Sequence, residues 1–118
     1  MPVTSIRLVT TQKEFTMISK KDALTKNLLY EKVAVIHAAF EDVPTTVAFV
    51  EVEKALSNAA KLEKAFVKTN SIDDAWWNNT EITKMFDGVS CRSTSVGDMV
   101  LIGNRKYKCE NAGWSEMS

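Results

Sequence analysis

Side chains that can hold an anion are concentrated in the run Arg92-Ser93-Thr94-Ser95-Val96-Gly97-Asp98. One guanidinium and three hydroxyls in a single loop can grip a phosphate, a nucleotide or an acidic partner. The run also has a structural interpretation, in which Gly97 allows an unusual backbone conformation, Asp98 caps the turn and Arg92 pairs with an acid. We favour this structural interpretation and keep the anion site as the alternative. No Gly-x4-Gly-Lys-Ser/Thr pattern is present, so the run is not a P-loop.

A nucleophile with a general base is the second chemistry to consider, and the chain holds one histidine, His37, and two cysteines, Cys91 and Cys109. A catalytic histidine needs an acid to orient it and a nucleophile beside it, and no recognisable activating motif flanks either cysteine. The three residues match no C-x2-C or H-x3-H spacing, so we expect no metal and no cofactor. We expect His37 to be packed and hydrogen-bonded, the thiols to be reduced, and the protein not to be an enzyme.

A short basic cluster, Arg105, Lys106 and Lys108, lies on a predicted hairpin strand. Side chains alternate along a strand, so Tyr107 and Cys109 should face one way and the two lysines the other. The cluster can contact RNA or DNA phosphate, but three charges are too few for tight non-specific binding at physiological salt. Lysines also protect an edge strand from pairing with another chain, which is the commoner role. Nucleic-acid binding therefore remains the alternative interpretation.

Three tryptophans are candidates for packing or recognition. Trp76 and Trp77 are adjacent, so they cannot both point inward from one helix or strand. We expect one to pack in the core and the other to lie near the surface, where Trp is a common interface anchor; the open alternative is that both cover the hairpin from two sides. We expect Trp114, near the end of the chain, to be a core residue.

The elements that position these residues follow from periodicity and turn signals. Residues 3–9 alternate loosely and are rich in β-branched types, which predicts a strand, and a second short strand is expected at 14–18. A capping box at Ser19 predicts a helix over residues 20–30. Residues 33–40 are apolar nearly all round, and this pattern fits either a helix or a buried strand.

The middle of the chain carries its clearest helix. Residues 45–52 favour a strand by propensity. Residues 53–69 carry an apolar stripe at helical spacing, and Asn70 is a plausible stop. A second capping box, at residues 71–74, predicts a short turn or helix that carries the paired tryptophans.

The last part of the chain has β character. Residues 95–98 predict a turn and residues 99–102 a strand. Gly103-Asn104 is a hairpin signal, because both residues accept a positive φ, and residues 105–109 form the return strand. We therefore expect one α+β domain over residues 1–118, with a small antiparallel sheet that includes the C-terminal hairpin and one to two helices packed on one face.

Composition excludes several classes of protein. The 118 residues carry 15 basic and 15 acidic side chains, so the chain lacks the basic excess usual in a nucleic-acid binder. No apolar run approaches the ~18 residues of a membrane span, so we expect no membrane association. The first residues show neither a basic n-region nor an apolar h-region, so we expect no secretory signal.

A resemblance to a known family rests on a series of short runs between residues 55 and 117. In order, the runs are Leu62-Glu63-Lys64-Ala65-Phe66, Thr69-Asn70-Ser71-Ile72-Asp73, Trp76-Trp77-Asn78, Cys91-Arg92-Ser93-Thr94-Ser95-Val96-Gly97-Asp98, Tyr107-Lys108-Cys109 and Gly113-Trp114. This series resembles a family of small, largely uncharacterised proteins encoded by bacteriophages and related mobile elements. The resemblance implies a setting, the cytoplasm of a phage-infected bacterium, and it implies no reaction.

These observations lead to one functional expectation and two alternatives. We expect a phage-encoded, non-catalytic binding protein that acts on a host protein, in host takeover or as an anti-defence inhibitor. The alternatives are a small nucleic-acid-binding protein and a sponge for a signalling nucleotide. The candidate interface residues are Trp76, Trp77, Arg92, Ser93, Thr94, Ser95, Arg105, Lys106 and Lys108. The sequence gives no indication of the oligomeric state.

Overall fold

A computed structural model describes residues 27–71 and 74–117. The chain divides into two units, residues 1–30 and 31–118, and the sheet core and the clusters discussed below belong to the second. The strands predicted at 3–9 and 14–18 lie outside the described residues. So does most of the helix predicted at 20–30, of which the described residues 27–29 are helical. The prediction of a single domain over the whole chain stays a prediction.

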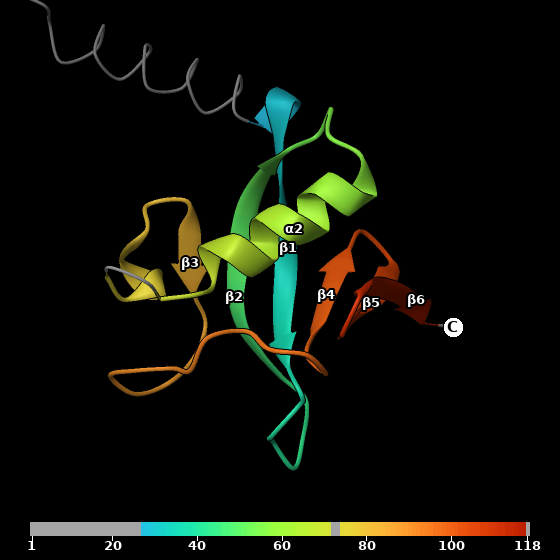
Figure 1. The fold of residues 1–118 in the computed structure, drawn as a ribbon. Helices are drawn as coiled ribbons and strands as arrows, with labels where there is room; N and C mark the ends of the chain where they lie inside the picture. Colours follow the sequence, from blue (N-terminus) through green and yellow to red (C-terminus); the bar gives the residue numbers. More distant parts are fainter. Residues whose placement is uncertain (1–26, 72–73, 118) are drawn as a thin grey trace, which may run out of the picture. The chain divides into compact units, whose positions relative to one another are not determined.

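The second unit is built on an antiparallel sheet, which has six strands within the described residues, in the order β3-β2-β1-β4-β5-β6 (Figure 1). The strands are β1 (Tyr30–His37), β2 (Thr45–Glu53), β3 (Ile82–Lys84), β4 (Met99–Ile102), β5 (Arg105–Glu110) and β6 (Gly113–Met117). A helix, α2 (Asn58–Lys68), and a 3-10 helix, η1 (Trp76–Asn78), follow β2. The α+β prediction, with an antiparallel sheet and a C-terminal hairpin, is confirmed.

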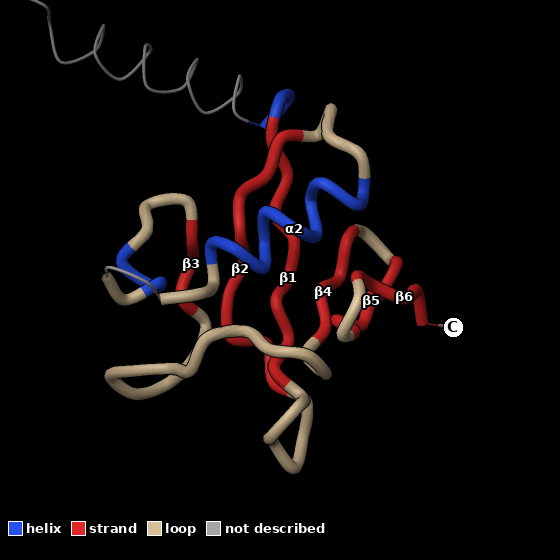
Figure 2. Tube along the Cα trace, viewed as in Figure 1, coloured by secondary structure: helices blue, strands red, loops and turns tan. Residues whose placement is uncertain are grey.

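One face of the sheet is covered by α2 and by the long loop between β3 and β4, both of which cross it in Figure 2. The strands present alternate residues to this face, and the ones that lose all solvent contact include Val33 and Val35 of β1 and Val50 and Val52 of β2. Leu62 and other residues of α2 complete the core cluster from the helix side. The chain therefore forms two layers, with a helix and an irregular loop sharing the second.

The apolar run at 33–40 is a strand as far as His37. It is a central strand, between β2 and β4, and its side chains from residue 33 to residue 36 are apolar on both faces of the sheet. Ala34, whose side chain is on the face of the sheet away from α2, is also buried. Apolar side chains on both faces remove the polar alternation that would have distinguished this strand from a helix.

Helix α2 begins later than the apolar stripe predicts. β2 continues to Glu53 and a turn follows, so the helix starts only after Ser57. The Ser57 hydroxyl accepts a hydrogen bond from the Ala60 N–H at 3.2 Å, which satisfies one of the free donors of the first turn. The helix ends at a Thr69 cap, one residue before the predicted stop. None of the helices within the described ranges is long and apolar enough to cross a lipid bilayer.

Candidate functional site

Arg92 lies at the centre of the loop that was the first candidate site. Its guanidinium donates to both carboxylate oxygens of Asp98, at 2.7 and 2.8 Å, and to both of Glu41, at 2.8 and 3.1 Å. A fifth hydrogen bond goes to the Ser93 carbonyl at 3.0 Å. The guanidinium also lies 4.9 Å from the ring centre of Phe40. All five N–H donors of Arg92 thus have acceptors within the fold, and none is left to hold an anion.

Asp98 is the matching centre of negative charge and has no solvent exposure. Besides Arg92, its carboxylate accepts from the N–H groups of Ala38, Ala39 and Ser95, at 2.8 to 2.9 Å. Burial alone would raise the pKa of Asp98, but the hydrogen bonds from Arg92 and the three N–H groups outweigh burial and hold that pKa at about 2. The carboxylate therefore joins the end of β1 to the turn before β4.

The turn itself needs a glycine. Gly97 has a φ of +98°, a conformation that side-chain-bearing residues rarely adopt. Its N–H donates to the Cys109 carbonyl, and the Cys109 N–H donates to the Asp98 carbonyl, so the turn is tied to β5. Glycine, acid and arginine thus have the roles that the structural interpretation gave them, and that interpretation is confirmed.

A directed chain of hydrogen bonds runs beneath this turn. The Thr69 hydroxyl donates to the Ala65 carbonyl at 2.7 Å, so it accepts from the Thr94 hydroxyl at 2.8 Å. Because the Thr94 hydroxyl already donates its proton to Thr69, its oxygen accepts a hydrogen bond from His37 Nε2 at 3.0 Å. Nδ1 of the neutral ring is left as the acceptor for the Cys91 thiol, whose Sγ lies 3.7 Å away. His37, Thr69 and Thr94 are all buried, and the chain leaves each of them paired.

This pairing of Cys91 with His37 has the opposite electrostatics to a catalytic thiolate pair. Burial raises the pKa of the Cys91 thiol, and the positive charge of Arg92 offsets only part of this rise. Burial also lowers the pKa of His37, although Asp98, whose Oδ2 lies 3.9 Å from Nε2, acts in the other direction. Both effects favour a neutral thiol beside a neutral imidazole, whereas a nucleophilic cysteine needs its thiolate form.

The remaining serines of the loop bind backbone groups. The Ser93 hydroxyl accepts from the Ser71 N–H at 3.0 Å, and the Ser95 hydroxyl donates to the Ser93 carbonyl at 3.4 Å. Both cysteines are free thiols. Within the part of the chain that the structure describes, no group of three or more His, Cys, Asp or Glu side chains is placed to hold a metal ion.

The two adjacent tryptophans have different environments. Trp76 is buried in the core cluster, and its indole N–H donates to the Arg92 carbonyl at 3.1 Å. Trp77 is half-buried, and it stacks edge-to-face on Trp76 and on Phe86, with ring centres 5.5 Å apart in both pairs. Trp76 is thus the core member of the pair and Trp77 the one nearer the surface.

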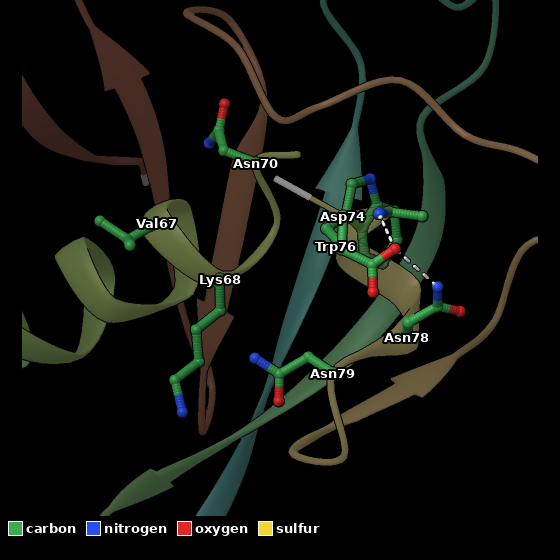
Figure 3. Close-up of a pocket in the computed structure, with 8 residues that line it drawn as sticks. Val67, Lys68, Asn70, Asp74, Trp76, Asn78 and Asn79 are labelled. Carbon is green, nitrogen blue, oxygen red and sulfur yellow. Dashed lines mark hydrogen bonds between the residues drawn. The ribbon is translucent and has the colours of Figure 1, made fainter. Parts of the chain in front are cut away.

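A cavity of about 370 Å³ opens beside Trp76, between the end of α2 and η1 (Figure 3). Its polar side chains are engaged in local structure. Asp74 accepts from the Ala75 N–H at 2.8 Å and from the Asn78 amide at 3.1 Å. Lys68 forms an ion pair with Glu81. The cavity therefore presents few free polar groups to a ligand.

The basic hairpin residues do not form one patch. Lys106 and Lys108 are exposed and pair in register with Leu101 and Met99, on the sheet face away from α2. Arg105 belongs to the opposite face and lies 3.9 Å from Glu116. Tyr107 is buried as the alternation predicts, and its hydroxyl accepts from the Asn58 amide at 3.0 Å. Its ring is thus not free to stack on a base.

An α2–β6 groove, not predicted from the sequence, lies beside the hairpin. It consists of two adjoining cavities, of about 520 and 230 Å³, which share Glu63, Gly113 and Trp114. Trp114 is half-buried rather than a core residue. Its indole N–H donates to Glu63 Oε1 at 3.2 Å, and its ring packs edge-to-face on the Phe66 ring, with ring centres 6.3 Å apart. The groove combines an accessible aromatic ring with carboxylates.

Comparison of the chain with protein-family models, with curated proteins and with solved structures gives no match in any of the three. The geometry and the resemblance described above are therefore the grounds for a functional proposal.

Proposed function

We propose that the protein is a non-catalytic protein-binding module and that the α2–β6 groove is its contact site. In keeping with the resemblance to phage and mobile-element proteins, its partner is a host protein in the bacterial cytoplasm. The observation that carries this proposal is the position of Trp114, a half-buried indole at the junction of two open cavities. Tryptophan is among the residues that most often dominate binding energy at protein interfaces.

The size and lining of the groove support a side-chain anchor. Its larger cavity, of about 520 Å³, is lined by apolar surface from Leu62, Tyr107 and Trp114, with Glu63 and Glu116 at its border. A concave, mostly apolar site with a few polar groups is the usual form of a recognition pocket. The Arg92 cluster contrasts with it, because its donors already have acceptors.

The groove favours a protein partner over nucleic acid. Its charged lining residues are acids, of which Glu63 and Glu116 present their carboxylates on the face that α2 covers and repel phosphate. The exposed lysines of β5 lie on the other face of the sheet. An anti-defence or takeover role remains part of this proposal and depends on the identity of the partner.

The test compares two half-buried tryptophans. Tagged wild-type protein, Trp114→Ala and Trp77→Ala are used to capture proteins from a bacterial lysate, and a captured protein is then purified and titrated against each variant. The proposal expects a stoichiometric partner whose affinity falls at least about tenfold with Trp114→Ala and changes little with Trp77→Ala. Thermal unfolding of each variant shows that it is folded. Absence of a partner, or equal binding by folded Trp114→Ala, contradicts the proposal.

A further inference from the structure

We infer that the partner presents an extended, basic segment that adds as a strand to the free edge of β6 and places a lysine or arginine side chain in the α2–β6 groove. This inference rests on the proposed function, because it specifies the chemistry of the partner at the same site. It combines three observations: an unprotected sheet edge, the direction of two side chains and the charge of the groove.

The edge at β6 is open for pairing. β6 is last in the strand order and pairs in register with β5, from Lys106 with Met117 to Glu110 with Gly113. In the described part of the chain, nothing pairs with its other edge. Proline and lysine, which commonly protect edge strands, are lacking in the five residues of β6. The opposite edge, β3, has three residues and carries Lys84. β6 is therefore the better template for an added strand.

Two side chains of β6 point toward the groove. Trp114 contacts Glu63 and Phe66 of α2, and Glu116 lines the larger cavity. They are two residues apart, so they share one face of the strand. A strand paired to β6 places its alternate side chains on that same face, about 5 Å from their neighbours. A residue opposite Trp114 would thus enter the groove.

The charge of the groove selects a cation. Glu63 and Glu116 are among the residues that line the two cavities, and no lysine or arginine is among the described residues that line them. Glu110 also borders the smaller cavity, but its carboxylate accepts from the Ser115 hydroxyl on the other face of the sheet. Arg105 reaches Glu116 only at 3.9 Å, with both side chains at least half exposed, so this pair neutralises little of the charge.

The pKa of the Cys109 thiol, which lines the smaller cavity, also reflects nearby negative charge. Burial, and then the negative charges of Asp98, Glu63 and Glu110, raise its pKa. A lysine or arginine that enters the groove can bind Glu63 and lie against the face of Trp114 as a cation–π pair. A glutamate-bearing segment would instead meet the like charges of Glu63 and Glu116. Charge complementarity therefore assigns a basic segment to this edge.

The probes are eight-residue peptides that alternate arginine with threonine, labelled for fluorescence anisotropy. Controls are the same peptide with glutamate for arginine, and the arginine peptide N-methylated at alternate backbone positions. The full-length chain carries either Glu63→Gln with Glu116→Gln, or Asp42→Asn with Asp87→Asn, which are exposed acids outside the groove. Both double variants change the net charge equally, so non-specific attraction weakens equally in both.

We expect the arginine peptide to bind the wild-type chain, and its affinity to fall about tenfold in the glutamate-to-glutamine variant but little in the aspartate-to-asparagine control. N-methylation should weaken binding at least as strongly, and backbone amide shifts should concentrate in residues 113–117. Equal binding of the acidic peptide, insensitivity to N-methylation, or equal losses in the two double variants overturn the inference. If the basic peptide fails while partner capture still depends on Trp114, the inference falls and the proposed function stands.

Discussion

Asp98→Asn removes the negative charge at the centre of the β3–β4 loop while keeping the size of the side chain. The carboxylate accepts five hydrogen bonds, two from Arg92 and three from backbone N–H groups. Asparagine offers one acceptor oxygen, and its amide nitrogen would face other donors. Breaking a buried ion pair costs about 3–5 kcal/mol. Arg92 keeps its contacts with Glu41, so we expect the lower end of that range, about 3 kcal/mol.

The pH dependence gives an independent measure of the same carboxylate. The pKa of Asp98 is about 2 in the folded protein, against an ordinary value of 3.8. As the pH falls, the unfolded chain therefore takes up this proton first, and the folded state loses stability from about pH 3.8 down to about pH 2. This lowering of the pKa corresponds to about 2 kcal/mol of stability. The Asp98→Asn variant should lack this contribution.

Urea unfolding at pH 7 measures the stability lost in Asp98→Asn, and urea unfolding at steps between pH 4 and pH 2 measures the pH-dependent contribution of Asp98. At pH 7 the variant should also melt roughly 12 °C lower, since unfolding entropy is about 2.1 cal/mol/K per residue. Asp87→Asn, at an exposed loop position, is the matched control and should change little. If Asp98→Asn lies within about 1 kcal/mol of the wild type at pH 7, or loses the same stability below pH 4, the reasoning from the ion pair is wrong.

Three further predictions follow from the described contacts. Gly97→Val should destabilise the fold by about 2–3 kcal/mol in urea unfolding, more than Gly88→Val. Both glycines have a positive φ, but only at Gly97 would a Cβ lie 3.0 Å from another side chain; an unchanged midpoint for Gly97→Val would contradict this. Trp76→Ala should cost about 3–5 kcal/mol and Trp77→Ala clearly less, and equal losses in thermal unfolding would show that both are core residues. Cys91 should react slowly with a thiol reagent at pH 7 and faster only above its ordinary pKa of 9.0, whereas rapid labelling at neutral pH would refute the protonated thiol.

The parts of the fold that were predictable carry local signals. The hairpin over 99–109 combines an apolar strand and an alternating return strand with a glycine turn, and Gly103 has the positive φ that this turn requires. The turn at 95–98 was also predictable from the sequence, because Asp98 caps it through the N–H of Ser95, only three residues away. Such features depend on neighbours along the chain, and tertiary contacts only reinforce them.

The parts that were missed depend on distant partners. The start of α2 was placed too early because the apolar residues of β2 continue the helical stripe, and only the Ser57 cap separates the two elements. β3 has three residues, too few to show a period, and forms against β2. β6 was not predicted as a strand, and it forms against β5.

The groove was not predictable for the same reason. Glu63 and Trp114, which meet at its centre, are 51 residues apart in the sequence. The one local signal was the position of Trp114, which we expected in the core. A tryptophan and an acid two residues apart on a terminal strand indicate a shared face, but which element faces them is decided by the packing of α2.

The polar residues that first suggested a reactive or binding site, Arg92, Thr94 and Asp98, serve instead to hold the β3–β4 loop in place. A single helix of eleven residues cannot cover the whole face of the sheet, so the β3–β4 loop covers part of it. A loop laid over a core carries backbone N–H and C=O groups that no helix or strand satisfies, and each needs a partner. The Asp98 carboxylate accepts from the Ser95 N–H, the Arg92 guanidinium donates to the Ser93 carbonyl, and the Trp76 indole donates to the Arg92 carbonyl. The α2–β6 groove, which we propose as the recognition site, is lined instead by a half-buried indole and by the carboxylates of Glu63 and Glu116.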